Sequence, residues 1–271
     1  MQIIFFTKFL RGHDVQRTGE IAKRLGFDGL DLAVRAGHCI NPENAETELA
    51  RAVKTWREMG LAVPLVTLEG TWTDPNHAGL QSVYRACGKA GVAFIKLGYW
   101  FWKPEEHYWD QVERYRRDLE AFQKMGDKLG VCTLVHTHSD AIYGSNASGA
   151  MHLVRGFDPR YVAVYLDPAH LAWDGEFLAM ALDIARDYLR MIGVKNALYE
   201  KSIVDGRAKW EKVLPALEEG LVDWKEAIGL LKKVGYDGPL CYHGEVDGYM
   251  SAEKIEEAAA RDMKYLRECL Q

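Results

Sequence analysis

The feature that most constrains the fold is a junction that recurs along the chain, in which a helical pattern stops at a glycine and a short apolar strand begins soon afterwards. Glycine suits the left-handed residue just past a helix end because it has no Cβ to clash there. The junction glycines are Gly26, Gly60, Gly91, Gly130 and Gly235. The strands that follow them are 29–33, 62–68, 92–97, 131–136 and 239–243. The recurrence predicts a chain of alternating helices and strands.

Three further apolar runs, at 2–6, 161–166 and 191–196, bring the predicted strands to eight. Amphipathic segments with apolar residues at roughly helical spacing lie between the strands. These segments are 14–25, 44–59, 76–90, 104–129, 149–155, 176–188, 222–234 and 251–269. The strands are nearly continuous apolar runs, as expected when both faces are covered, and the alternation implies a parallel sheet.

We therefore predict an α/β fold, a single (β/α)8 TIM barrel that forms one domain over residues 1–271. A barrel of about 250 residues is usual, so the length fits. An open doubly wound sheet is the alternative, but no G-x-G-x-x-G pattern follows the first strand. The longest irregular segments follow strands, on the side where barrels assemble active sites. They are 69–76, 98–104, 137–149 and 197–221.

Charge and cysteine content limit the partners of the chain. The formal net charge is −5 at pH 7, so there is no excess of positive charge to neutralise a nucleic-acid backbone. The five cysteines are far apart and never form a C-x-x-C pair, which favours a reducing, cytoplasmic location. Residues 1–10 lack the pattern of a signal peptide, and no apolar run approaches the length of a membrane span. We expect no nucleic-acid or membrane partner, and the sequence leaves a homo-oligomer open.

Four histidines follow strands in the second half of the chain, where a barrel places functional side chains. His136 and His138 lie at the end of one strand, His170 follows another, and His243 ends the last. Because side chains alternate along an extended strand, His136 and His138 are expected to share a face, and so are His243 and Glu245. The position of these residues predicts a polar site at the carboxyl end of the barrel.

Asp167 and Lys195 occupy equivalent places after two further strands, and Asn196 follows Lys195. Imidazoles and a carboxylate can bind a divalent transition metal and leave coordination positions open for a substrate. The same groups can instead donate and accept protons, since imidazole titrates near neutrality. Both interpretations remain open for this set of residues.

Polar and aromatic residues of other loops are candidates for binding a substrate. Arg35 follows the second strand and could meet an anionic group, and Asp31 and Glu69 end strands of the first half. Trp100 and Trp173 lie in loops after strands, where their rings could stack on the apolar face of a sugar. We predict substrate contacts for Arg35, Glu69, Trp100, Trp173 and Asn196.

Four segments resemble the xylose-isomerase-like barrel superfamily, which includes the sugar phosphate isomerases and epimerases. They are LGFDGLDLAVR near the start, Gly-Val followed by a strand and a histidine in the middle, DPRYVAVYLDPAH after it, and VDWKEAIGLLKKVGYDGPL near the end. The resemblance implies a small sugar-like substrate and the carbohydrate chemistry of an isomerase or epimerase. The superfamily also includes the type IV AP endonucleases. Their three-metal cluster and basic face have no counterpart in this sequence.

Typical members of this superfamily bind one divalent metal through Glu, Asp, His and Glu. By position, these ligands fall on His136, Asp167, Gly193 and His243, so only Asp167 agrees. The chain is similar to an atypical branch with Asp-x-x-His after strand six and His-x-Glu after strand eight. The resemblance implies either a site for Zn, Mn or Fe made of His136, Asp167 and His243, or a metal-free enzyme.

The resulting hypothesis is a sugar or sugar-derivative isomerase or epimerase that transfers a proton next to a carbonyl. Glu245 or His138 would be the base, and Lys195, His170 or a metal would stabilise the oxygen that becomes negative. Two alternatives remain. One is a glycoside lyase or hydrolase on the same fold, and the other is a non-catalytic sugar-binding barrel without a metal.

Overall fold

Eight parallel strands close into a barrel in the computed structural model, which describes residues 1–246 and 252–271. The order around the barrel is β1-β10-β7-β6-β5-β4-β3-β2. The strand bounds are β1 (Ile3–Phe6), β2 (Gly29–Ala33), β3 (Ala62–Thr67), β4 (Phe94–Lys96), β5 (Cys132–His136), β6 (Val162–Leu166), β7 (Leu189–Val194) and β10 (Leu240–Tyr242). The predicted (β/α)8 TIM barrel is therefore confirmed, and each strand lies within its predicted range or overlaps it.

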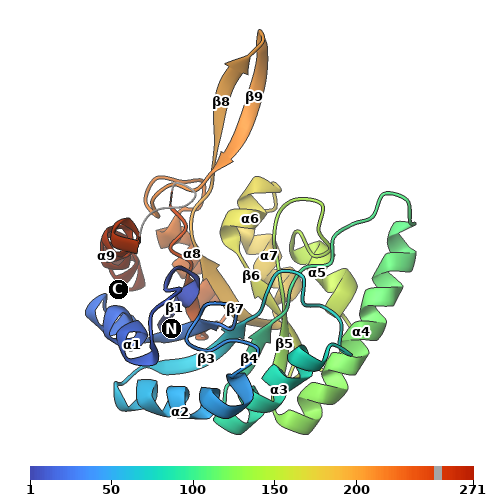
Figure 1. Ribbon diagram of the computed structural model, residues 1–271. Coiled ribbons are helices and arrows are strands. Elements are labelled where there is room, and N and C mark those ends of the chain that lie inside the picture. The colour runs from blue at the N-terminus through green and yellow to red at the C-terminus, as the bar shows by residue number, and fades with distance from the viewer. Residues whose placement is uncertain (247–251) are drawn as a thin grey trace.

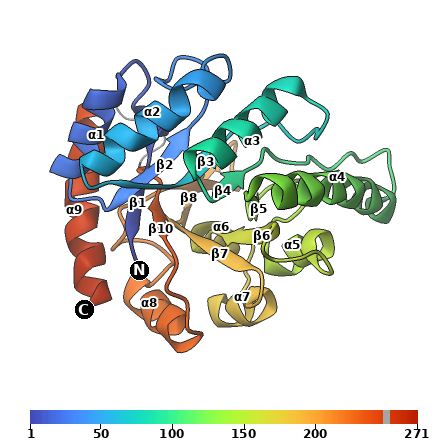
Figure 2. The same ribbon diagram turned by 90° about the horizontal axis from the view of Figure 1, so that it is seen from below.

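Helices surround the strands as an outer ring, which Figure 2 shows from below. The helices of the ring are α1 (Val15–Arg24), α2 (Ala45–Glu58), α3 (Ala78–Ala90), α4 (Tyr108–Leu129), α5 (Ala147–Val154), α7 (Leu178–Ala185), α8 (Trp224–Lys233) and α9 (Ala252–Leu270). Ser251, the first residue of the last predicted helix, lies outside the described residues. Two short helices were not predicted, the 3-10 turn η1 (Thr7–Phe9) and α6 (Pro168–Trp173).

The junction glycines adopt the conformation that the sequence predicts. All five have positive φ, between 67° and 82°. Gly91 and Gly130 are themselves the C-cap residues of α3 and α4, and the Gly130 amide donates to the carbonyl of Gly126. A Cβ in this left-handed region would be strained, so glycine lets each helix end and the chain turn back to the next strand.

Alternating side chains divide the core into two layers. On β1, Ile3 and Phe5 pack outward into the layer between strands and helices, whereas Ile4 and Phe6 point into the barrel. The barrel interior is completed by residues from other strands, including Leu65, Leu134, Ala163, Met191 and Cys241. These apolar side chains fill the barrel below the polar residues at the carboxyl ends of the strands, so the interior is a packed core and the site lies at its mouth.

An antiparallel hairpin corrects the prediction that 197–221 is irregular throughout. Its strands, β8 (Leu198–Val204) and β9 (Arg207–Val213), project away from the barrel in Figure 1. Asp205 and Gly206 form the turn with φ of 50° and 72°, the positive values that a two-residue hairpin turn requires. The Asp-Gly pair between two runs containing β-branched residues was the local signal for this hairpin.

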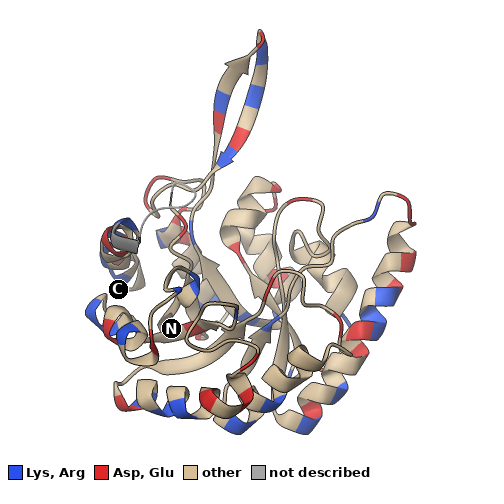
Figure 3. Cartoon of the chain, in the orientation of Figure 1, with Lys and Arg blue, Asp and Glu red and all other residues tan. Residues whose placement is uncertain are grey.

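Charged residues of both signs are distributed over the outer helices and along the hairpin (Figure 3). Lys and Arg alternate with Asp and Glu on α4, and no long stretch of one sign is visible on that helix. Within residues 1–246 and 252–271, every helix is too short or too polar to cross a bilayer.

Candidate active site

Polar side chains from all parts of the barrel surround a cavity of about 260 Å³ at the carboxyl ends of the strands. Strands β5, β7 and β10 and their loops contribute His136, His138, Lys195, His243 and Glu245. The opposite half of the barrel contributes a second set. This set comprises Phe6, Lys8, Asp31, Arg35, Thr67, Gly70, Lys96 and Tyr99. Several of the polar residues predicted at the strand ends therefore border a space that can hold a small molecule.

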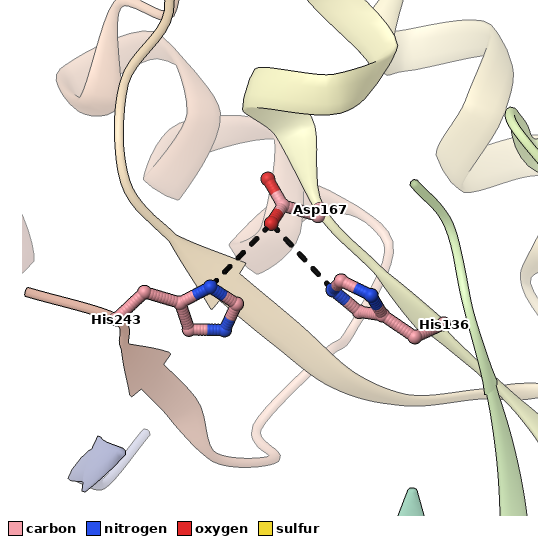
Figure 4. A group of neighbouring side chains, drawn as sticks. All are labelled: His136, Asp167 and His243. Carbon is pink, nitrogen blue, oxygen red and sulfur yellow. Dashed lines mark ion pairs between the residues drawn. The ribbon is translucent and has the colours of Figure 1, made fainter. Parts of the chain in front are cut away.

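His136, Asp167 and His243 converge, as Figure 4 shows. The Oδ2 atom of Asp167 lies 3.5 Å from Nε2 of His136 and 3.7 Å from Nδ1 of His243. One ligand atom from each of the three residues lies within 4.8 Å of the others. All three side chains are buried. This arrangement offers two imidazole nitrogens and one carboxylate oxygen to a single metal ion.

Neighbouring hydroxyl groups fix both imidazole rings. The Tyr99 hydroxyl lies 3.1 Å from Nδ1 of His136, and the Tyr165 hydroxyl lies 2.7 Å from Nε2 of His243. Each ring is thus held through the nitrogen that faces away from Asp167, as is usual for metal-binding histidines. Two atoms that face one another, His136 Nε2 and Asp167 Oδ2, are buried without a hydrogen-bond partner in the described part of the chain. Buried polar atoms normally have partners, so this pair fits a bound cation.

Lys195 links Asp167 to Glu245. Its ammonium lies 3.4 Å from Oδ2 of Asp167 and 2.8 Å from Oε2 of Glu245. Burial lowers the pKa of Lys195, but the negative charges of Asp167 and Glu245 outweigh burial, so the pKa is raised from its usual value. Burial raises the pKa of Glu245, but Lys195 and Lys8 hold it well below the usual value. Lys195 is therefore cationic and Glu245 anionic over the physiological pH range.

His138 and His170 are neutral and have defined tautomers. Nδ1 of His138 donates to the carbonyl of Ser139 at 2.8 Å, which leaves Nε2 as an acceptor. Burial, and then the charge of Lys195, lowers the pKa of His138 to about 4. Nε2 of His170 accepts from the Lys195 ammonium at 2.8 Å, so its Nδ1 donates to the Ser139 hydroxyl at 2.9 Å. His138 lines the cavity. His170 is not among the lining residues and positions Lys195 through the hydrogen bond to its ammonium.

The structure places the predicted substrate-binding residues in different surroundings. Arg35 lines the cavity, whereas Glu69, Trp100, Trp173 and Asn196 are not among its lining residues. Trp100 packs in the core against Tyr115, with ring centroids 5.4 Å apart. The Trp173 indole donates to the carbonyl of Leu198.

Asn196 holds the long loop after β7 together. Its amide nitrogen donates to the carbonyls of Leu217 and Val222, and its oxygen accepts from the amide of Val222. Asn196 is completely buried, so the structure gives it a loop-fixing contact in place of a substrate contact.

Lys8, Lys96 and Tyr99 line the cavity but were not assigned to the site from the sequence. Lys8 forms an ion pair with Glu245. Lys96 is a single charged residue within the apolar run VAFIKL, and that interruption was the available signal. The run gives no indication that the side chain points into the barrel, because a lysine at a strand end can equally extend into solvent.

Gly193 occupies the place where the superfamily's histidine ligand was expected. A Cβ at this position would lie 2.9 Å from Oδ2 of Asp167. The absence of a side chain therefore makes room for the Asp167 carboxylate in its present orientation. Within the residues that the structure describes, the group that could hold a metal ion consists of His136, Asp167 and His243.

Solved structures with the same fold include named sugar epimerases. The 3-keto-D-glucoside 4-epimerase YcjR from E. coli is 17% identical, with a TM-score of 0.74 over 99% of this chain and 100% of that chain. The D-psicose 3-epimerase from Clostridium cellulolyticum H10 is 15% identical, with a TM-score of 0.73 over 100% of both chains. A xylose isomerase-like TIM barrel protein from Mycobacterium smegmatis, solved in complex with magnesium, is 14% identical, with a TM-score of 0.70 over 99% of this chain and 96% of that chain. These likenesses show the fold.

No curated protein is similar enough in sequence to count as a match. The sequence model of the xylose isomerase-like TIM barrel family, in contrast, matches residues 20–269. That match spans nearly the whole barrel, including every residue of the His136, Asp167 and His243 cluster. The chain belongs to the xylose isomerase-like TIM barrel family.

Proposed function

We propose that the protein is an isomerase or epimerase of a keto sugar or keto-sugar derivative, and that it transfers a proton at the carbon next to the carbonyl. The observation that carries this proposal is the pairing, in one small cavity, of a neutral histidine with a free nitrogen and a buried ammonium group. Two barrels with the same fold are named as sugar epimerases, which supports the choice of substrate.

His138 is the better of the two candidate bases. Both oxygens of Glu245 accept hydrogen bonds from lysines, Oε1 from Lys8 and Oε2 from Lys195. Nε2 of His138 is an unprotonated acceptor in the cavity wall, because Nδ1 carries the proton that it donates to Ser139. A positioned base of this kind contributes about 10²- to 10⁴-fold to the rate of proton transfer. Glu245 instead holds Lys195 and Lys8 in place.

In the proposed reaction, His138 removes the proton from the carbon next to the carbonyl. The electron pair of that C–H bond forms a carbon–carbon double bond, and the π pair of the carbonyl moves onto its oxygen. The Lys195 ammonium donates a hydrogen bond to this oxygen as its negative charge develops. If His138 returns the proton to the former carbonyl carbon while the proton of the adjacent hydroxyl passes to the former carbonyl oxygen, the product is an isomer. If Lys195 delivers a proton to the opposite face of the same carbon, the product is an epimer, and exchange with solvent then returns a proton to Lys195 and removes one from His138.

The donor set fits one divalent transition metal. His136 and His243 offer nitrogen atoms and Asp167 an oxygen atom, a set that suits Zn, Mn or Fe better than Mg. Such an ion would polarise the substrate carbonyl and leave coordination positions open for its oxygens. The ammonium of Lys195 faces the same Asp167 oxygen, so it shares the neutralisation of that carboxylate.

Solvent exchange in D₂O tests the proposal without knowledge of the final product. Ketoses and their carboxylate and phosphate derivatives are incubated with the protein, and NMR follows deuterium entry next to the carbonyl. We expect exchange with the wild type and a rate roughly 10²- to 10⁴-fold lower for His138→Gln. His107→Gln is the matched control, because His107 is exposed at the start of α4.

The same preparations are purified without chelator and analysed for metal, and we expect Asp167→Asn to lose any metal that the wild type carries. Absence of exchange with every compound, despite measurable binding, would favour a sugar-binding barrel without catalysis. Exchange at an unchanged rate in folded His138→Gln would contradict the role of His138.

A further inference from the structure

Basic side chains outnumber acidic ones around the cavity. The cations are Lys8, Arg35, Lys96 and Lys195, and the carboxylates that line the cavity or contact its lysines are Asp31, Asp167 and Glu245. Lys8 and Lys195 are neutralised by ion pairs with Glu245 and Asp167. The remaining cations, Arg35 and Lys96, belong to the opposite half of the barrel.

Lys96 is a buried lysine of the cavity wall that forms no ion pair with the described residues. Its side chain is only 5% exposed. Among residues 1–246 and 252–271, no carboxylate lies within 4.0 Å of its Nζ atom, which instead sits 4.0 Å from the centroid of the Tyr99 ring. Burial, followed by the charge of Arg35, lowers the pKa of Lys96 to about 7. The charge of Asp31 only partly offsets these effects, and a ligand anion beside Lys96 would further stabilise its charged form.

Arg35 is held rigidly beside Lys96 and also lacks a carboxylate partner in the described chain. Its Nε and Nη2 atoms donate to the carbonyl of Leu68 at 3.2 and 2.9 Å. The guanidinium carbon lies 5.3 Å from the centroid of the Phe6 ring. These contacts fix the plane of the guanidinium group, and Nη1 makes no hydrogen bond with the described residues. A preorganised arginine of this kind binds an oxyanion with little loss of side-chain entropy.

The two cations border one side of the proton-transfer site. His136, Asp167, Lys195 and His243 belong to the consecutive strands β5, β6, β7 and β10. Lys96 ends β4, which pairs with β5, and Arg35 follows β2, two strands further along. We propose that the side of the cavity formed by Lys96 and Arg35 binds the carboxylate of an acidic sugar, whose carbonyl end faces His138 and Lys195. This inference names the substrate class of the proposed function and rests on it.

Asp31 favours a carboxylate over a phosphate ester at this position. It lines the cavity on β2, and its Oδ2 atom accepts from the Thr67 hydroxyl at 2.9 Å. Its other oxygen, Oδ1, has no hydrogen-bond partner among the described residues. A sugar acid carries one negative charge and neighbouring hydroxyl donors, which complement an acceptor, whereas a phosphate dianion would bring two charges beside Asp31.

A matched ligand series tests the inference by binding alone. Titration calorimetry compares D-fructose, D-fructuronate and D-fructose 6-phosphate on the wild type, Lys96→Met, Arg35→Met and the control Lys124→Met, which alters an exposed lysine of α4. We expect the wild type and control to bind the carboxylate at least tenfold more tightly than the neutral sugar. Lys96→Met and Arg35→Met should each lose most of this preference, and added salt should weaken it.

Equal affinity for all three compounds, a preference for the phosphate ester, or an unchanged preference in both folded variants would overturn the carboxylate assignment. Solvent exchange separates this result from the proposed function. If the carboxylate binds tightly without deuterium entry, the proton-transfer proposal fails and the anion site stands. If D-fructuronate exchanges with the same kcat/KM in wild type and Lys96→Met, the proton-transfer proposal stands and the anion site fails.

Discussion

Asp167 uses its two carboxylate oxygens for different purposes. Oδ1 accepts from the backbone amides of Ala169 and His170 at 3.0 and 3.4 Å, and so begins helix α6. Oδ2 faces His136, His243 and Lys195. The helix start thereby fixes the direction of the oxygen that belongs to the site. A single residue at the end of β6 couples local folding to the geometry of the cavity.

Asp31 makes protein stability depend on pH. Burial raises its pKa to about 7, and hydrogen bonds from Thr67 and Cys241 only partly offset this effect. The folded-state pKa lies above the unfolded value of 3.8. The stability that Asp31 contributes is therefore fully present below about pH 4 and is lost as the pH rises towards 7. Relative to Asp31→Asn, the wild type should lose about 2 to 3 kcal/mol of unfolding free energy between about pH 5 and pH 8.

Urea unfolding of both proteins at the two pH values measures this difference. Asp187→Asn, which changes an exposed aspartate, should track the wild type at both values. An Asp31→Asn variant with the same pH dependence as the wild type would show that Asp31 ionises normally in the folded state.

The sequence predicted the half of the site in which polar residues directly follow apolar strands. His136, Asp167 and His243 could be found in this way because strand ends in a parallel barrel meet at one face. Lys96 could not, because the direction of a long side chain depends on packing across the barrel. Asn196 was predicted to bind substrate and instead fixes a loop. The hydrogen bonds of its side-chain amide to Leu217 and Val222 depend on a loop path that the local sequence does not specify.

At the level of elements, the eight barrel strands were predictable because each is an apolar run bounded by turn residues. Strands β8 and β9 were missed because their polar and apolar side chains are nearly all exposed, so no buried face marks them as strands. Helix α6 was missed because it is only six residues long and begins at the side chain of Asp167. Burial therefore determined which elements could be predicted.

Two glycine substitutions should have opposite effects on stability. Gly193→Ala places a Cβ 2.9 Å from Oδ2 of Asp167 inside the barrel, and we expect a loss of about 1 to 3 kcal/mol through overpacking. Gly229→Ala lies within α8, where an added Cβ meets nothing within 4 Å. It should stabilise the protein by about 0.5 to 1 kcal/mol, because alanine restricts the unfolded chain and favours the helix.

Chemical denaturation of the two variants and the wild type checks both signs. A neutral Gly193→Ala would mean that Asp167 has room to move away from its present position. A destabilising Gly229→Ala would mean that α8 is constrained by contacts outside the described chain.

At the scale of the whole molecule, the barrel and the hairpin differ in how they are stabilised. Every barrel strand pairs with two neighbours and is covered by helices, whereas β8 and β9 pair only with each other. The hairpin is attached at its base, where the Tyr199 hydroxyl donates to the carbonyl of Trp173 and Lys212 pairs with Asp140. Beyond this base, Ile203 and Trp210 are 64% and 59% exposed.

A two-stranded hairpin without further packing is marginally stable in water, so β8 and β9 should open without unfolding of the barrel. Hydrogen exchange measured by mass spectrometry should show amides of 200–210 exchanging roughly a thousandfold or more faster than those of β5 and β6. Trypsin should cleave first at Lys201, Arg207 or Lys209, and the nicked barrel should keep its far-UV spectrum. Slow exchange in the hairpin would contradict the expectation that it opens independently of the barrel. If that protection disappeared on dilution of the protein, the apolar side chains of the hairpin would be buried against a second copy of the chain.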